Sequence, residues 1–168
     1  MPGNDTLYYW DSCLFLAWLK DEQRPTGEMD GVREIIERHR RRDCRIITSV
    51  LTSVEVLSAR IPAGVEHLLT GLMRRVNRQG VDTKVAGMAH DLRNHYAKIG
   101  GKSLSTADAL HLATAIIYRA NEFHTFDNEG RARTLGLIPL SGNVAGHRLT
   151  ICKPEARNPG LDLRKPGL

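Results

Sequence analysis

The hydrophobic residues of this chain fall into two kinds of segment, which alternate along the sequence. Short apolar runs without a helical period predict strands, and they occupy residues 7–10, 45–49 and 123–126. The stretches between them repeat apolar residues every three or four positions, which predicts amphipathic helices. Strands that alternate with helices favour a doubly wound α/β domain with a largely parallel sheet.

Helix starts are marked by side chains that can cap a first turn: Ser12, Asp30, Thr52 or Ser53, Asp82 and Ser105. Apolar spacing places two amphipathic helices, over residues 65–76 and 85–96, in a long crossover between the second and third strands. After residue 127 we expect a short helix through Leu135. Residues 137–140 and residues 149–152 can each supply a further strand.

The helix predicted from Ser105 is apolar on most of its surface, which indicates a buried element. Ser105 and Asp108 form a variant of the capping box, in which an aspartate takes the place of the usual glutamate. The helix dipole stabilises a carboxylate in the first turn by roughly 0.3–1 kcal/mol, so Asp108 also has a purely structural explanation.

Four carboxylates are expected at one end of the sheet: Asp11, Glu55, Asp108 and Asp127. Asp11 and Asp127 directly follow predicted strands, and Glu55 lies in the first turns of the helix after another strand. The end of a parallel strand and the first turn of a neighbouring helix face the same crevice, so the side chains should converge. Glu55 could be a solvated helix position, but its sequence neighbours are mostly apolar.

Carboxylates that share a crevice repel one another and lose hydration, but they can together bind a hard divalent cation. Oxygen-only ligation suits Mg²⁺ or Mn²⁺ better than zinc. Such an ion can activate water and stabilise the charge that develops on a phosphoryl group. This is the chemistry of a nuclease.

The charge of the chain fits an anionic polymer as the partner. The formal net charge is +5, from 24 Lys and Arg against 19 Asp and Glu. A basic surface can hold such a polymer while the acids act on it. The candidate RNA-binding residues are arginines at the end of one predicted helix and on the outer side of another. Cations at a helix C-terminus are also favourable for the helix itself, and outer arginines can be solvated helix faces. The candidates are Arg40, Arg41, Arg42, Arg74, Arg75 and Arg78.

Cysteine usage and the absence of apolar spans predict a cytoplasmic protein. The three cysteines are widely spaced and form no CxxC pair, which is typical of reduced thiols and argues against a zinc ribbon. The sequence contains neither a membrane-length apolar run nor a secretory leader at its N-terminus. We therefore expect no contact with a membrane.

The sequence resembles PIN-domain ribonucleases, in particular the VapC-type toxins. The resemblance rests on four ordered motifs: strand then Asp11-Ser12, the run TSVLTSVE ending at Glu55, the helix segment DALHLATA from Asp108, and Thr125-Phe126-Asp127. They cover about residues 7–140. No single motif is specific, but their order and spacing are.

The resemblance implies a three-layer α/β/α sandwich that cleaves RNA with Mg²⁺ or Mn²⁺. Asp11, Glu55 and Asp108 would be the core metal ligands and Asp127 the fourth, with hydroxyls from Ser12 and Thr125 beside them. It also implies a cognate antitoxin as partner and leaves room for a homodimer. Residues 1–152 would form the PIN-like nuclease domain, followed by an irregular Pro/Gly-rich tail over residues 153–168.

Several alternatives stay open at this stage. Glu129 is a spare acid that could replace or assist Asp127. His111 is either a general base or, as we expect, a hydrogen-bonded member of the site wall, because a metal already activates water. A receiver-like phosphoacceptor domain would need an adjacent acidic pair, which Asp11 lacks. A PIN-like module that binds RNA or protein without cutting is the remaining alternative.

Overall fold

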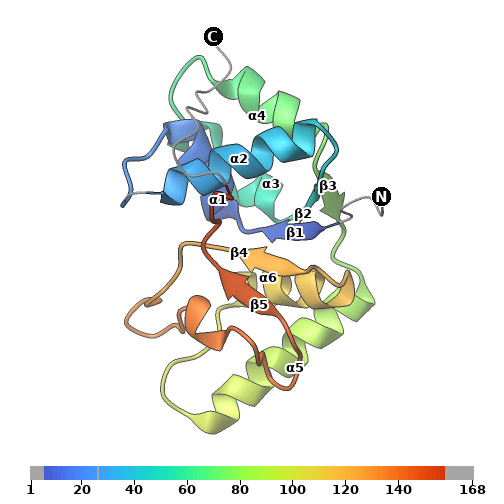
Figure 1. Ribbon diagram of the computed structural model, residues 1–168. Helices are drawn as coiled ribbons and strands as arrows, with labels where there is room; N and C mark the ends of the chain where they lie inside the picture. Colours follow the sequence, from blue (N-terminus) through green and yellow to red (C-terminus); the bar gives the residue numbers. More distant parts are fainter. Residues whose placement is uncertain (1–5, 26, 158–168) are drawn as a thin grey trace.

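The computed structural model describes residues 6–25 and 27–157, which form a five-stranded sheet with helices on both faces (Figure 1). The strands are β1 (Leu7–Trp10), β2 (Arg45–Ser49), β3 (Asn77–Gln79), β4 (Glu122–His124) and β5 (Thr150–Cys152). The helices are α1 (Ser12–Lys20), α2 (Glu28–Arg40), α3 (Thr52–Glu55), α4 (Glu66–Met73), α5 (Thr83–Ile99) and α6 (Thr106–Ile117). Short 3-10 helices cover Ser58–Arg60 and Ile138–Leu140.

All four strand pairs are parallel, in the order β3-β2-β1-β4-β5. The apolar strand β1 lies in the middle, where Tyr8 pairs with Ile46 on one side and with Glu122 on the other. Because every strand points the same way, their carboxyl ends meet at one edge of the sheet. The predicted α/β class with a mainly parallel sheet is confirmed.

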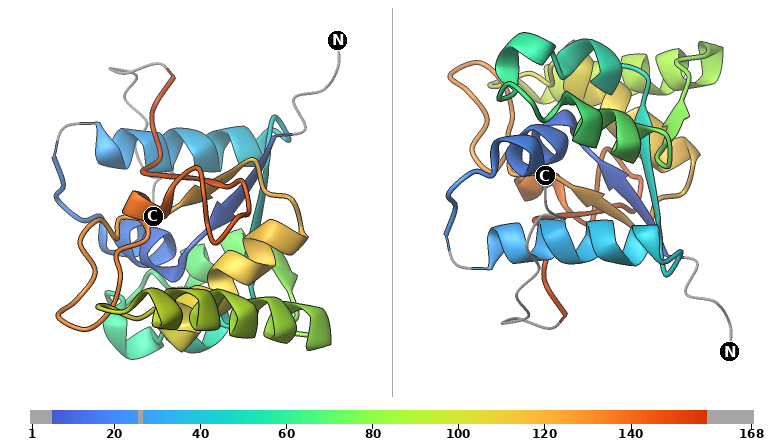
Figure 2. Two further views of the ribbon diagram at one scale, coloured as in Figure 1. Left: turned by 90° about the horizontal axis from the view of Figure 1, so that it is seen from below. Right: turned by 90° about the horizontal axis from the view of Figure 1, so that it is seen from above.

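Successive side chains of β1 point to opposite faces and build two separate cores. Tyr8 and Trp10 pack with α1, α2 and α4, whereas Tyr9 packs with α5 and α6. Figure 2 shows α2 and α5 on opposite sides of the sheet. The molecule is therefore the three-layer sandwich that the resemblance implied.

Three predicted boundaries were wrong. Asp11, rather than Ser12, is the N-cap of α1, because its carboxylate accepts the Ser12 N–H. Helix α2 begins at Glu28, before Asp30, and β4 ends at His124, before Phe126. In each case the boundary lies one to two residues from the position that the sequence indicates.

The edge strand β3 was not predicted, because its residues Asn77, Arg78 and Gln79 are polar. It pairs only with β2, and an edge strand with exposed side chains leaves no hydrophobic pattern in the sequence. The long crossover therefore contains this strand in addition to its two predicted helices.

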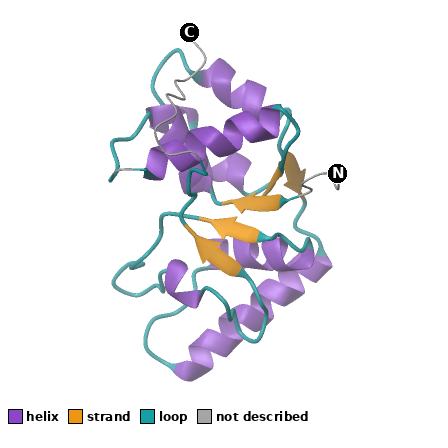
Figure 3. Cartoon of the chain, in the orientation of Figure 1, coloured by secondary structure: helices purple, strands orange, loops and turns teal. Residues whose placement is uncertain are grey.

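The segment between β4 and β5 was also misread, since no helix forms through Leu135 (Figure 3). It is a compact loop in which Gly130 approaches the Thr134 carbonyl and Gly136 approaches the Asn128 carbonyl so closely that a Cβ at either position would clash. Of the two candidate strands, residues 149–152 contribute β5, and residues 137–140 form a 3-10 turn.

The chain beyond β5 crosses the N-terminal part of α2. Lys153 pairs with Glu28, and the Pro154 carbonyl lies directly against Gly31, where a Cβ would clash. Residues 158–168 of the predicted tail lie outside the described part of the chain, so the domain boundary at residue 152 stays a prediction. Among the described helices, none is both long and apolar enough to span a membrane.

Candidate metal-binding and catalytic site

The four predicted acids lie on segments that meet at the carboxyl edge of the sheet. Asp11 follows β1, Glu55 ends α3 just after β2, Asp108 lies in the first turn of α6, and Asp127 follows β4. Asp11, Glu55 and His111 each offer a ligand atom, and these atoms lie within 4.8 Å of one another. Burial and the charges of Asp11 and Asp127 raise the pKa of Asp108, so these three carboxylates act on one another.

Asp11 is a buried residue, with 8% of its surface exposed, and hydrogen bonds hold both of its carboxylate oxygens. One carboxylate oxygen, Oδ1, accepts the Ser12 N–H at 2.6 Å, and Oδ2 accepts the Thr125 hydroxyl at 2.9 Å. The Cys13 thiol also approaches Oδ2, at 3.5 Å, and burial raises its pKa, so it remains a neutral donor. Ser12 and Thr125 therefore lie beside this acid, and Cys13 is a neighbour that sequence reasoning missed.

His111 joins Glu55 to the inner wall of the site. Its Nε2 lies 2.7 Å from Glu55 Oε2 and 3.9 Å from Asp11 Oδ1. Burial acts to lower the pKa of His111, but the Glu55 hydrogen bond and the Asp11 charge raise it overall. Burial likewise acts to raise the pKa of Glu55, and the contacts with His111 lower it overall. The histidine is thus hydrogen-bonded in the site wall, as we expected.

Tyr9 supports this histidine from the core. The hydroxyl of Tyr9 lies 2.6 Å from His111 Nδ1 and accepts the Ser49 N–H at 3.1 Å. Tyr9 is fully buried, and burial together with the Asp11 charge raises its pKa, so the phenol stays protonated. A chain of contacts therefore runs from β2 through Tyr9 and His111 to Glu55. The sequence indicated only an apolar strand residue here.

Asp108 takes part in the N-terminal cap of α6 and also lies near the other acids. The Ser105 hydroxyl accepts the Asp108 N–H at 3.0 Å and donates to the Asp108 carboxylate, which completes the predicted cap of α6. These two hydrogen bonds alone would explain why an aspartate stands at this position, without any role in binding a metal. The charges of Asp11 and Asp127 around the same carboxylate are not required for capping, and they place Asp108 among the acids.

Asp127 also has a turn-forming role, whereas Glu129 stands apart. Asp127 Oδ1 accepts the Gly130 N–H at 2.9 Å, and its own N–H donates to the Thr125 hydroxyl. Glu129 is exposed, and its described contact is through the backbone carbonyl, which accepts from Lys102. The structure therefore brings Asp127 near Asp108 and gives Glu129 no described contact with the acids.

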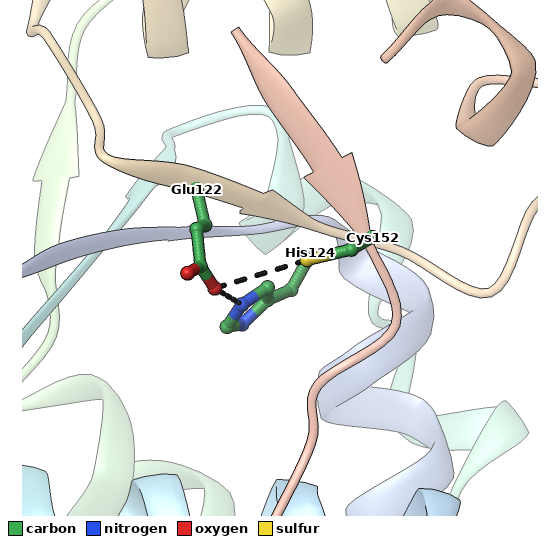
Figure 4. Close-up of side chains that lie close together, drawn as sticks. All are labelled: Glu122, His124 and Cys152. Atoms are coloured by element: carbon green, nitrogen blue, oxygen red, sulfur yellow. Dashed lines mark hydrogen bonds and ion pairs between the residues drawn. The ribbon is translucent and has the colours of Figure 1, made fainter. Parts of the chain in front are cut away.

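A second group with metal-ligating residue types, Glu122, His124 and Cys152, lies on β4 and β5 (Figure 4). Trp10 Nε1–H donates to His124 Nδ1 at 3.2 Å, which places the proton of a neutral ring on Nε2. That Nε2–H donates to Glu122 at 2.8 Å, so the nitrogen has no lone pair for a metal. Burial and the Glu122 charge raise the pKa of Cys152 to about 12. This group is a hydrogen-bonded network.

The six candidate arginines do not form one surface. Arg40, Arg42 and Arg75 surround a hollow beside the C-terminal end of α2, which lies at the amino edge of the sheet, away from the acids. Arg41 is the exposed C-cap of the same helix. Arg74 and Arg78 instead line a groove against α3, the helix that carries Glu55.

Comparisons with known proteins agree with this architecture. The sequence matches the profile of the PIN domain over residues 8–134. Among solved structures, VapBC2 from Rickettsia felis, bound to a DNA fragment from their promoter, is similar with a TM-score of 0.62 and 14% identity, covering 87% of this chain and 98% of that one. FitAcB from Neisseria gonorrhoeae gives a TM-score of 0.52 and 18% identity, covering 71% and 87%. No curated protein sequence is significantly similar.

Proposed function

The chain belongs to the PIN domain family, and on that premise we propose that it is a divalent-metal-dependent endoribonuclease and the toxin of a toxin–antitoxin pair. The observation that carries the proposal is the convergence of Asp11, Glu55 and Asp108 around the buried His111. The substrate would be RNA, and the partner a cognate antitoxin. The likeness to VapBC2 and FitAcB supports the fold behind this assignment, and a homodimer stays a prediction.

The donor set fits Mg²⁺ or Mn²⁺. Asp11, Glu55, Asp108 and Asp127 would hold the ion through oxygen atoms, which these hard cations prefer. The raised pKa of Asp108, caused first by burial and then by the charges of Asp11 and Asp127, also fits, because a bound cation would offset both effects. When bound, the ion supplies positive charge for the phosphoryl oxygens and makes water more acidic.

The protein's own side chains hold the acids in place for that chemistry. Thr125 and the Ser12 backbone fix both oxygens of Asp11, and His111 fixes Glu55. A preorganised set of charges needs no reorganisation when the reaction begins, which is how such sites lower a barrier. Hydrolysis then adds water across one P–O bond of the RNA backbone and releases two shorter strands.

The test is cleavage of RNA by the purified chain without any partner protein. We expect cleavage with Mg²⁺ or Mn²⁺, none after chelation, and none from Asp11→Asn or Glu55→Gln with the metal present. Glu129→Gln is the matched control, because this exposed acid lies outside the acidic group and should leave cleavage unchanged.

Cleavage that survives exhaustive chelation would refute the metal mechanism. Binding of RNA without any cleavage would favour the alternative, a non-cleaving module with the same fold. Sequencing the ends of cleaved total RNA would identify the target, about which the acidic site itself carries no information.

A further inference from the structure

A groove of about 290 Å³ lies between α3, α4 and β3. The groove combines hydroxyl, apolar and guanidinium groups, and its lining residues are Thr52, Ser53, Val56, Leu69, Thr70, Met73, Arg74 and Arg78. Its volume is near the lower limit for small-molecule sites, so it suits one flat ring and its substituents rather than a double helix.

The two arginines of the groove form no ion pair with the part of the chain that the structure describes. Arg78 donates to the Ser53 hydroxyl at 3.3 Å, and within the described residues no carboxylate lies at ion-pair distance from Arg74 or Arg78. By contrast, Arg33 and Arg40 both pair with acids on the same surface layer of helices. A guanidinium with free N–H groups matches the oxygens of a phosphate.

The floor of the groove is apolar and adaptable. Met73 and Leu69 are partly buried and pack on the core beneath, and Val56 is buried within it. Methionine is flexible and polarisable, so it can lie against the face of a ring without requiring one particular base. Arginines that can bind a phosphate therefore lie beside an apolar floor that can contact a base, and a nucleotide has both groups.

The groove and the acidic site share the short helix α3. Ser53, which faces Arg78, precedes the acid Glu55 by two residues on the same short helix. Arg78 also pairs in register with Thr48, whose hydroxyl donates at 2.7 Å to the carbonyl of Trp10, the residue before Asp11. The groove and the acids are thus attached to the same short helix and to neighbouring strands of the sheet.

We propose that this groove binds one nucleotide of single-stranded RNA next to the phosphate that is cut, with Arg74 and Arg78 on its phosphate and Met73 against its base. The inference rests on the proposed ribonuclease function. It assigns substrate positioning to two of the six arginines. The small volume of the groove would favour a single strand over a duplex.

The experiment measures RNA binding apart from cleavage. A fluorescently labelled, mixed-sequence single-stranded RNA of roughly twelve nucleotides is titrated with the full chain in a chelator, and anisotropy is followed at several salt concentrations. We expect the double variant R74A/R78A to bind on the order of tenfold more weakly and to flatten the plot of log affinity against log salt by about 1.4, or roughly 0.7 for each lost contact.

Lys84→Ala with Lys98→Ala is the matched control, because it removes the same charge from exposed positions of α5 on the other face. This control should keep most of the wild-type slope. R74K/R78K should restore the slope, since it restores the charge. Met73→Ala should weaken binding without changing the slope, because it removes an apolar contact rather than an ionic one. Melting curves confirm that each variant is folded.

The outcomes separate this inference from the function on which it rests. A wild-type chain that neither binds nor cleaves RNA would refute the proposed function. Suppose instead that the wild-type chain cleaves RNA, but that R74A/R78A keeps the wild-type salt slope or loses no more affinity than the lysine control. That result would overturn the proposed role of the groove alone. In that case the groove would be a surface for another kind of partner, such as a protein segment.

Discussion

Replacing Asp108 by asparagine should abolish cleavage and yet stabilise the metal-free protein. Burial, followed by the charges of Asp11 and Asp127, raises the pKa of Asp108 above its ordinary 3.8, although the Ser105 hydrogen bond opposes the shift. A raised pKa means that the folded state favours the protonated acid. The stabilising contribution of that proton is therefore complete below pH 3.8 and is lost as the pH rises through the folded pKa.

At neutral pH the wild-type fold must hold an ionised Asp108, whereas the asparagine variant does not. Each unit of pKa elevation corresponds to about 1.4 kcal/mol, and each kcal/mol moves the melting temperature by roughly 2–4 °C in a domain of this size. Asparagine keeps an oxygen that can accept the Ser105 hydroxyl, so the helix cap should survive. We expect the variant to melt at or slightly above the wild-type temperature, with an advantage that shrinks in acid.

Leu112→Ala is the comparison that separates chemistry from folding. Leu112 lies on the same helix and is fully buried, so its truncation leaves a cavity and costs about 2–5 kcal/mol. The melting temperature should then fall by roughly 4–20 °C, and any lost activity would reflect unfolding. Leu110, on the same helix, is less suited to this comparison, because its side chain is only half-buried and lines a groove against α5.

The assay is a set of melting curves with chelator and with Mg²⁺, beside RNA cleavage. The wild type and Leu112→Ala should both gain stability from Mg²⁺, by about 2.7 kcal/mol when the ion is at a hundred times its Kd. Asp108→Asn should lose most of that gain. If Asp108→Asn unfolds the metal-free protein as severely as Leu112→Ala, then Asp108 is only a helix cap and the acidic site is wrong.

Other contacts give smaller effects that are as readily measured. Thr125→Val removes the donor to Asp11 and should cost about 1–3 kcal/mol in urea unfolding, with less cleavage; an unchanged midpoint would contradict this. His111→Gln should lower metal-free stability most between pH 4.5 and 6.5. The pKa of Glu55 is lowered, so its contribution to stability is lost in acid, and the pKa of His111 is raised, so its contribution is lost in base. A loss of stability that does not depend on pH would exclude the ionic pair. Gly31→Ala should destabilise the protein by about 1–3 kcal/mol through its clash with Pro154. Gly87→Ala, on an open face of α5, should stabilise it by roughly 0.5–1 kcal/mol. Equal unfolding midpoints for the two variants would mean that the chain after β5 does not pack against α2.

The fold was predictable where hydrophobic period and burial coincide. Strand β1 has two buried faces and helix α6 is apolar nearly all round, so both can be recognised from their apolar residues in the sequence. Strand β3 does not, because backbone pairing with β2 holds its polar residues in place. The loop after Asp127 was misread for a related reason, since close approaches of backbone to glycine fix it rather than side-chain periodicity.

The candidate site was predictable in its acids but not in the contacts behind them. A carboxylate after a strand is visible in sequence, and the parallel topology then brings such residues together. The hydroxyl of Tyr9 is not visible, because an aromatic residue in an apolar strand is expected to serve packing alone. Its link to His111 spans 102 positions in sequence, and only the packed sheet brings the two side chains together.

Three of the four acids also take part in hydrogen bonds at the ends of helices or turns. These bonds explain how the acids can stay close together although their charges repel. Asp11 caps α1, Asp108 belongs to the cap of α6, and Asp127 closes the turn at Gly130. The same hydrogen bonds that satisfy these helix and turn ends fix where the carboxylates point, so the fold itself positions like charges that would otherwise separate. Alanine substitutions here would remove the cap and the charge together. Asparagine removes the charge and keeps an acceptor, so only the Asn series measures what the charges do.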